Sequence, residues 1–339
     1  MGIKSFICGC EGLTLGPDEK ALFREHQPWG FILFARNIES PSQVSELTAS
    51  LREAVSRDEV PILVDQEGGR VRRMRPPEWA DYPSGCQFGR LYQKSREAGL
   101  RLAWLQSRLM AIDLGRCGIN VDCLPVLDVP VPGSHEIIGD RAYSENPEIV
   151  AEIGRKAAEG LLDGGVLPIV KHIPGHGRAG ADSHEALPEV DASLELLESR
   201  DFLPFKLLND MPMAMTAHVV YTSIDDESPA TTSAKVINEI IRGYIGFDGL
   251  LMSDDLSMNA LSGDYSQRAK SAFEAGCDVV LHCNGNAEEM QAIAEVSPVL
   301  AGEGLARAEA ALKLLHSSSS PDEESLREEF RQLCEMADG

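Results

Sequence analysis

The sequence is poor in positive charge and has no long apolar run. Lys and Arg number 31 against 54 Asp and Glu, and the formal net charge is -23. An acidic surface repels phosphate and gains nothing from counterion release, so the composition argues against nucleic-acid binding. The N-terminus lacks the charged start, apolar region and cleavage site of a signal peptide, and no apolar stretch could cross a bilayer. The chain is therefore expected to be soluble and cytoplasmic, without a membrane or nucleic-acid partner.

Paired cysteine motifs are also missing. The eight cysteines lie mostly inside apolar runs, and none belongs to a CxxC pair. This usage is typical of reduced, buried thiols in a cytosolic protein. The one close pair, Cys8 and Cys10, is interpreted as core or loop packing rather than redox or metal chemistry.

No Gly/Ser-rich or Pro-rich linker divides the 339 residues, so a single domain is expected. Short apolar, β-rich runs recur along the chain, at 5–12, 30–37, 61–69, 119–129, 166–175, 213–221, 249–258 and 277–285. Segments with helical periodicity lie between them, at 40–55, 95–115, 146–165 and 233–246. Continuous apolar strands indicate a parallel sheet covered by helices, and eight such units predict a (β/α)8 TIM barrel over residues 1–301. Residues 302–339 are expected to form a C-terminal helical extension packed on the barrel.

Polar residues cluster at the ends of the predicted strands. They are Arg36, Asn37, Asp65, Gln66, Glu67, Asp128, Lys171, His172, His218, Asp254, Asp255, His282 and Asn284. In a barrel the carboxyl ends of the strands share one rim, where active sites form. The sequence therefore predicts one pocket built from separate motifs, with some of these residues serving as structural braces.

The stretch 168–191 carries the densest chemistry. An apolar run there breaks into a Gly/His-rich loop that contains Asp182-Ser183-His184. Residues i and i+2 of an extended segment point the same way, so Asp182 can fix the tautomer of His184 and form an acid/base pair. A loop histidine held by a local hydrogen bond is the alternative interpretation.

Three further motifs offer polar groups for a substrate. Asp65 with a nearby Arg can hold hydroxyl or carbonyl groups, and Arg141 is either a second clamp or a surface ion pair. Asp254 and Asp255 close an apolar strand and must point to opposite sides, so one of them can face the pocket as a nucleophile. Asp255 could instead cap the following helix.

Two other chemistries stay open at this point. A metal could bind His172, His176 and His184 together with Asp182 and Asp254, although Pro174-Gly175 prevents a helical ligand pair. Lys171 at a strand end could form a Schiff base, as lysines in barrel aldolases do.

The motifs KHIPGHG and DSH, with VDQEGGRV, GDRAYS and MSDDLSM, together resemble the catalytic domain of glycoside hydrolase family 3. The resemblance runs from the first predicted strand to the last, and within the family it is to single-domain bacterial β-N-acetylglucosaminidases of peptidoglycan recycling. It implies that Asp254 is the nucleophile and His184 the general acid/base, with Asp182 as its partner. The residues that it implies for holding terminal N-acetylglucosamine are Asp65, Arg73, Arg141, Lys171 and His172.

The reaction implied by this resemblance is retaining glycoside hydrolysis through a covalent glycosyl-aspartate. It needs no metal and no other cofactor. The expected partner is a small carbohydrate, the muropeptides that carry N-acetylglucosamine and 1,6-anhydro-N-acetylmuramic acid, and the chain is expected to work as a monomer.

Overall fold

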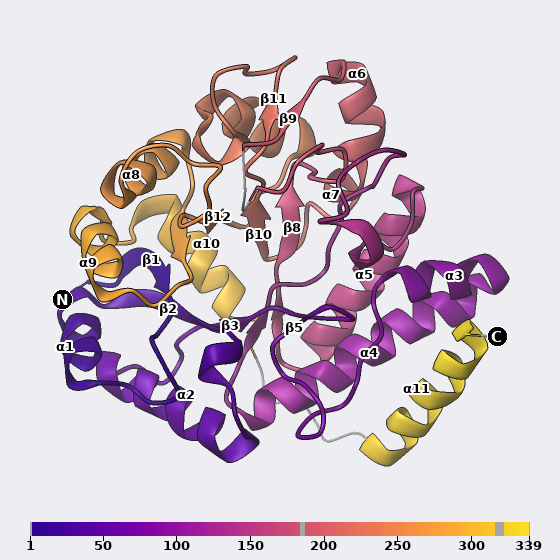
Figure 1. Cartoon of the computed structure of the whole chain (residues 1–339), viewed down its shortest axis with the longest axis horizontal. Helices are drawn as coiled ribbons and strands as arrows, with labels where there is room; N and C mark the ends of the chain where they lie inside the picture. Colours follow the sequence, from indigo (N-terminus) through magenta and orange to yellow (C-terminus); the bar gives the residue numbers. More distant parts are fainter. Residues whose placement is uncertain (1, 184–186, 316–321, 339) are drawn as a thin grey trace.

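The computed structural model describes residues 2–183, 187–315 and 322–338, in which strands and helices alternate along the chain (Figure 1). The barrel strands are β1 (Lys4–Cys8), β2 (Pro28–Leu33), β3 (Ile62–Val64), β6 (Val121–Asp122), β7 (Leu167–Pro168), β8 (Val170–Ile173), β10 (Met213–Thr216), β12 (Leu250–Asp255) and β13 (Val279–His282). Each of the eight predicted apolar runs overlaps at least one of them.

The strands form one parallel sheet in the order β7-β6-β3-β2-β1-β13-β12-β10-β8. Its two end strands are separated in the chain by Ile169 alone, so β7 and β8 are two pieces of a single fifth strand. The sheet therefore closes on itself through that strand, which confirms the predicted (β/α)8 barrel. Neighbouring strands are in parallel register, with Met213 of β10 opposite Leu250 of β12.

Helices surround the barrel (Figure 1). They are α1 (Pro17–His26), α2 (Pro41–Val55), α4 (Arg96–Arg116), α5 (Pro147–Asp163), α7 (Leu203–Leu207), η5 (Val236–Ile245), α8 (Tyr265–Ala275) and α9 (Ala287–Val296). The predicted boundaries hold because the local chemistry decides them: Ser40 and Asn146 accept backbone N–H groups at the starts of α2 and α5. Gly246 ends η5 in the left-handed region. No helix in the described part of the chain is both long and apolar enough to span a membrane.

Smaller elements lie in the connections between the barrel strands and the outer helices. They are η1 (Ala35–Asn37), β4 (Gln66–Gly68), β5 (Val71–Arg72), α3 (Cys86–Lys94), η2 (Gly139–Arg141), β9 (Glu189–Val190), α6 (Leu194–Leu196), η3 (Leu197–Asp201), β11 (Val220–Tyr221) and η4 (Ala230–Thr232). The antiparallel hairpin of β4 and β5 is the one that matters most for the site, because it follows β3 directly at the barrel rim.

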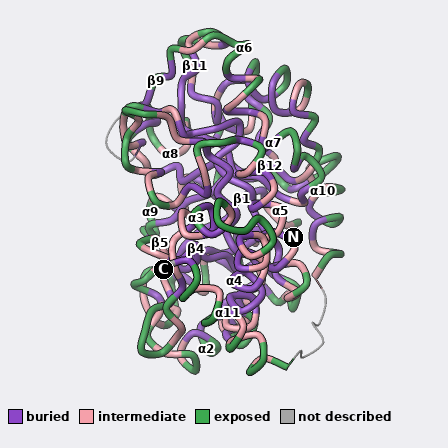
Figure 2. The backbone as a smooth tube through the Cα atoms, turned by 90° about the vertical axis from the view of Figure 1, so that its right-hand side faces the viewer, coloured by how far each residue is buried: buried purple, intermediate pink, exposed green. Residues whose placement is uncertain are grey.

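The chain ends in two further helices, α10 (Gly302–Leu312) and α11 (Glu323–Asp338). Ala308 and Ala311 of α10 belong to the same apolar cluster as Ile7, Trp29 and Leu250 inside the barrel. The side-on view shows the buried backbone running through the middle of the molecule (Figure 2). Since side chains fill the barrel interior, the rim formed by the carboxyl ends of the strands is where an active site is expected.

Candidate active site

A cavity of about 270 Å³ lies at the carboxyl ends of the barrel strands. Its polar lining consists of Asp65, Glu67, Arg70, Arg73, Arg141, Lys171, His172, His176, Ser183, Asp254 and Asp255. Phe34, Met215, Met258, Leu281 and Cys283 are among its apolar lining residues. A concave site with a few convergent polar groups on an apolar wall is the usual form of a small-molecule site.

The structure brings six of the eight predicted site residues together at this cavity: Asp65, Arg73, Arg141, Lys171, His172 and Asp254. The predicted acid/base His184 lies outside the described residues. Its neighbour Ser183 lines the cavity, and Asp182 precedes Ser183 directly. The predicted convergence of separate strand ends on one rim is therefore observed for these six side chains.

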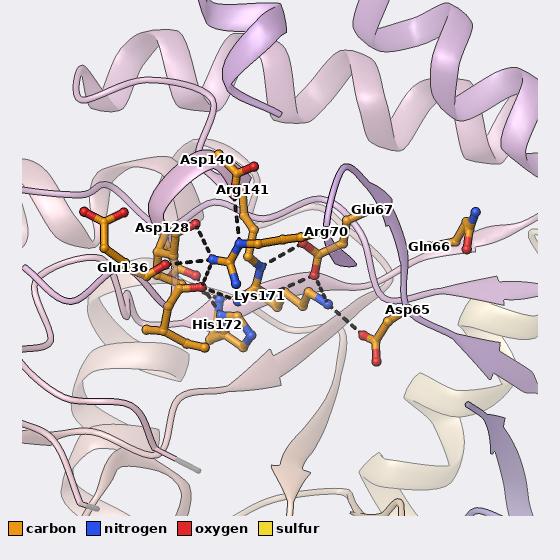
Figure 3. A network of polar contacts seen from close by, with 12 residues as sticks. Asp65, Gln66, Glu67, Arg70, Asp128, Glu136, Asp140, Arg141, Lys171 and His172 are labelled. Carbon is orange, nitrogen blue, oxygen red and sulfur yellow. Dashed lines mark hydrogen bonds and ion pairs between the residues drawn. The ribbon is translucent and has the colours of Figure 1, made fainter. Parts of the chain in front are cut away.

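An ion-pair network forms one wall of the cavity (Figure 3). The Lys171 ammonium lies 2.8 Å from Asp65 Oδ1 and 2.7 Å from Glu67 Oε1. Arg141 donates two hydrogen bonds of 2.8 Å to the two oxygens of Glu67, and Arg73 donates one of 2.9 Å to Asp65 Oδ2. The alternative of a surface ion pair for Arg141 is wrong, because its side chain is 10% exposed and its partner Glu67 is 5% exposed.

The network fixes the charge of each member. Burial alone would raise the pKa of Glu67, but Arg141 and Lys171 outweigh it and lower that pKa to about 2. Burial likewise opposes ionisation of Asp65, yet Lys171 and Arg73 bring its pKa well below the ordinary value. Burial would lower the pKa of Lys171, whereas Asp65 and Glu67 raise it well above the ordinary value. Lys171 is therefore a protonated ammonium, which argues against a Schiff base at this residue.

A second pair positions the imidazole of His172. Oδ2 of Asp128 lies 2.6 Å from His172 Nδ1, and Oδ1 accepts the backbone N–H of His176 at 2.6 Å. Asp128 is fully buried, and although burial alone would raise its pKa, His172 lowers it to about 2. Because Asp128 is ionised, Nδ1 of His172 carries the proton and Nε2 is left for a ligand.

His176 is a buried neutral imidazole in the cavity wall. Burial and the neighbouring His172 lower its pKa to about 4. Its ring packs edge-on against that of His172 with centroids 5.7 Å apart. In the described part of the chain, no three His, Cys, Asp or Glu side chains gather so as to hold a metal ion.

The two acids at the end of β12 have different surroundings. Asp255 accepts the backbone N–H and the hydroxyl of Ser257, at 3.0 and 2.5 Å, and the backbone N–H of Cys283 at 3.1 Å. It therefore braces the turn that follows the strand. The alternative that Asp255 caps the next helix is wrong, because Asp264 is the N-cap of α8. Asp254 lines the cavity and accepts the N–H of Asp255 through Oδ1 at 2.8 Å.

The loop after β8 returns to the side of the barrel that carries Asp254. The Ser183 carbonyl accepts the backbone N–H of Ala260 at 3.2 Å, and its hydroxyl lies 3.7 Å from Met258 Sδ. Both partners belong to the connection that follows β12. The segment containing Asp182 and Ser183 is thus held beside the connection that follows β12, the strand that carries Asp254.

Several rim residues named from the sequence serve as braces. Arg36 and Asn37 donate to the carbonyl of Cys10, at 2.9 and 3.0 Å. His218 is buried and contacts the Thr231 hydroxyl at 2.7 Å and the Asp255 carbonyl at 3.0 Å. These contacts explain why polar side chains stand at strand ends without lining the cavity.

Arg70 ties the hairpin to the loop after β6. It donates to Asp140 Oδ1 at 2.9 Å and to the carbonyls of Glu136 and Ile137 at 2.8 and 2.6 Å (Figure 3). Arg141 follows that loop directly, so Arg70 fixes the segment that delivers Arg141 to the cavity.

Sequence reasoning assigned no role to Glu67 or Asp128, although both stood among the polar strand ends. Glu67 is the centre of the ion-pair network, and Asp128 is the partner of His172. The available signal was their position: each is an acid at the end of a predicted buried strand, where an ionised carboxylate needs a cationic or N–H partner.

The chain is similar to known proteins over most of its length. Residues 15–311 match the model of the glycosyl hydrolase family 3 N-terminal domain. A β-hexosaminidase of Alkalilimnicola ehrlichii is 40% identical over 282 residues, which cover 82% of this chain and 80% of that protein. A β-hexosaminidase of Aromatoleum aromaticum is 34% identical over 332 residues, covering 97% and 92% of the two chains.

Solved structures are similar over nearly the whole chain. NagZ from Neisseria gonorrhoeae in complex with N-trifluoroacetyl-D-glucosamine superimposes with a TM-score of 0.89 at 31% identity, covering 98% of this chain and 99% of that one. A glycoside hydrolase family 3 β-N-acetylglucosaminidase from Paenibacillus sp. gives a TM-score of 0.85 at 30% identity. The match covers 97% of this chain but 66% of that longer protein.

Proposed function

The chain belongs to glycoside hydrolase family 3, and on that premise we propose that it is a retaining exo-β-N-acetylglucosaminidase. Its substrate would be peptidoglycan fragments in which terminal, non-reducing N-acetylglucosamine is linked to 1,6-anhydro-N-acetylmuramic acid. Its role would be the recycling of cell-wall material in the cytoplasm. The names of the similar β-hexosaminidases and the sugar bound to gonococcal NagZ support the sugar specificity. The eight free thiols, all within the described residues, support a reducing compartment.

In the first step, the Asp254 carboxylate attacks the anomeric carbon of the bound sugar. The bond to the leaving oxygen breaks with its electron pair, and the His184 imidazolium gives that oxygen a proton. The product is a covalent glycosyl-aspartate with inverted configuration. Asp182 would orient the imidazolium and stabilise its charge before the proton is transferred.

In the second step, neutral His184 takes a proton from water as the water oxygen attacks the same carbon. The ester to Asp254 breaks, the carboxylate is restored, and the second inversion gives net retention. The two carboxylates of the usual scheme are thus replaced by one carboxylate and one imidazole.

The ion-pair wall would hold the sugar. Asp65 and Arg73 present an acceptor and a donor for ring hydroxyls, while Lys171 and Arg141 supply further donors and His172 offers Nε2. These groups are already ordered by Glu67 and Asp128, so little orientation is lost when the sugar binds. A cavity of about 270 Å³ above a filled barrel suits a chain end and therefore exo-action.

The observation that carries the proposal is that Asp254 and Ser183 line the same cavity. The nucleophile comes from the end of β12, and Ser183 directly precedes the proposed acid/base in the chain. A retaining glycosidase needs those two groups on either side of the scissile bond.

The test is release of nitrophenol from the aryl N-acetyl-β-glucosaminide and from the matching β-glucoside. The parent chain should prefer the N-acetyl substrate, and Asp254→Asn should lower kcat by about 10³-fold or more, because it removes the nucleophile. Asp210→Asn, which alters a carboxylate in an ion pair with Arg155 on the outside of the barrel, is the matched control and should leave kcat unchanged.

A second variant separates the acid/base from the nucleophile. His184→Gly should lower kcat on an unactivated substrate by about 10² to 10⁴-fold while binding changes little. Parent-level turnover in Asp254→Asn, or in His184→Gly through both steps, would contradict the assignments. Equal rates on the two aryl sugars would instead indicate a broader family 3 β-glycosidase.

A further inference from the structure

The C-terminal helix α11 is fastened to one side of the barrel, beside α3 and α4 (Figure 1). Glu329 accepts two hydrogen bonds from Arg101 of α4, at 2.8 and 2.6 Å. Near the C-terminal end of α11, Lys94 of α3 donates to the Met336 carbonyl at 3.2 Å. These contacts fix both the rotation and the position of the helix along its axis.

The buried face of α11 closes over Tyr82. Phe330 packs edge-on against the Tyr82 ring, with centroids 5.8 Å apart, and leaves that tyrosine 1% exposed. The Tyr82 hydroxyl donates to Asp113 Oδ2 at 2.6 Å, and Arg327 of α11 donates to the other oxygen of Asp113 at 2.8 Å. Helix α11 therefore holds Tyr82 in two ways: Phe330 contacts its ring, and Arg327 binds the Asp113 carboxylate that accepts its hydroxyl.

The backbone at Tyr82 in turn holds the β4–β5 hairpin. The Tyr82 carbonyl accepts the backbone N–H of Gly69 at 2.8 Å. Gln106 of α4 donates to the carbonyls of Glu67 and Pro83, at 3.2 and 3.1 Å. A Cβ at Gly68, whose φ is +97°, would lie 2.2 Å from the Pro83 carbonyl oxygen. The hairpin and the segment that contains Tyr82 and Pro83 are therefore in direct backbone contact.

This hairpin carries the centre of the sugar-site network. Glu67 of β4 binds Arg141 and Lys171, and Arg70 of the turn fixes the loop that precedes Arg141. A misplacement of roughly 1 Å at such groups can cost about a hundredfold in rate, because the polar contacts are directional. A shift of Tyr82 would move the Gly69 backbone through their hydrogen bond, and with it the hairpin that places Glu67 and Arg70 at the cavity.

We propose that α11 is a positioning element of the sugar site, and that Phe330 and Tyr82 are positioning residues that set the hairpin bearing Glu67 and Arg70. The kinetic test of this inference rests on the proposed function, because it needs a substrate that the chain hydrolyses. The hydrogen-exchange test at the Gly69 amide does not depend on that function.

The experiment uses full-length Phe330→Ala. Its KM for the aryl N-acetyl-β-glucosaminide should rise by about tenfold with little change in kcat, because the sugar-holding groups lose their support while Asp254 on β12 does not. Hydrogen exchange at the Gly69 amide should accelerate in the same variant. Phe330→Leu, which keeps an apolar contact, should restore most of both.

The matched control is Phe273→Ala on α8, a partly buried Phe on an outer helix far along the chain from the hairpin. It should lower the thermal midpoint without changing KM or Gly69 exchange. Arg327→Gln is a milder variant that removes only the link to Asp113, and it should shift KM and exchange in the same direction as Phe330→Ala.

Two results would overturn the inference. In one, Phe330→Ala and Arg327→Gln lower the thermal midpoint but leave KM and Gly69 exchange at parent values, so that α11 only adds stability. In the other, Phe273→Ala changes KM as strongly as Phe330→Ala. If Gly69 exchange accelerates in Phe330→Ala but the parent hydrolyses neither aryl sugar, the inference stands and the proposed function fails.

Discussion

Glu67 should be the most sensitive carboxylate of the site, and Glu67→Gln tests this without changing the shape of the side chain. Oε1 of Glu67 accepts from Arg141 Nη2 at 2.8 Å and lies 2.7 Å from Lys171 Nζ, and Oε2 accepts from Arg141 Nε at 2.8 Å. The amide retains one oxygen, so at least one of these charge-assisted contacts is lost, and an NH2 group then faces a guanidinium N–H.

The expected cost follows from burial. One hydrogen bond to a charged group contributes about 1.5 to 3 kcal/mol, and breaking a buried ion pair by removing one charge costs about 3 to 5 kcal/mol. Lys171 would keep its ion pair with Asp65, and Arg141 would be left with the more distant charges of Asp128 and Asp65. We therefore expect Glu67→Gln to lower the free energy of unfolding by about 3 to 5 kcal/mol.

The assay is denaturant unfolding followed by fluorescence, with kcat/KM on the aryl sugar measured in parallel. Asp210→Asn is the control, because its pair with Arg155 is 59% and 35% exposed and should contribute about 1 kcal/mol or less. A loss below about 1 kcal/mol for Glu67→Gln, no larger than that of the control, would refute the reading of Glu67 as the centre of the network.

Three further outcomes are expected. The pKa of His176 falls from 6.5 to about 4 on folding, so the stability that its neutral form contributes is present above pH 6.5 and is lost as pH falls towards 4. This pH-dependent loss in the free energy of unfolding should amount to about 3 kcal/mol. His176→Gln should flatten that part of the plot of unfolding free energy against pH. Asp128→Asn should lower the free energy of unfolding by about 1.5 to 3 kcal/mol and weaken sugar binding, measured by denaturation and KM, since His172 loses its partner. Gly68→Ala should cost more than about 1 kcal/mol, whereas Gly115→Ala, in open space on α4, should stabilise by about 0.5 to 1 kcal/mol in the same denaturation assay.

The barrel could be predicted from sequence because each parallel strand is a continuous apolar run with a polar residue at its end. The same regularity predicted that Asp65, Lys171 and Asp254 would meet, since all barrel strands end at one rim. Local helix signals were equally informative, as Ser40 and Asn146 stand where α2 and α5 begin.

The remainder depends on contacts between distant residues. Glu67 and Arg141 are 74 positions apart, so neither motif alone could tell a buried ion pair from a surface one. Asp254 and Asp255 both line the cavity, and their roles differ because Ser257 and Cys283, which the sequence could not place, donate to the oxygens of Asp255. The role given to His184 stays a prediction, because that residue lies outside the described part of the chain.

The filled interior of the barrel has a consequence for turnover. Ala308 and Ala311 of α10 pack in the same apolar cluster as the side chains that fill the barrel interior. On the proposed mechanism, a sugar released at Asp254 would leave through the mouth by which the next substrate enters, because side chains fill the barrel below it. If the proposed function holds, free N-acetylglucosamine should compete with substrate, and the departing aglycone would have to clear the mouth before water could reach the proposed glycosyl-aspartate.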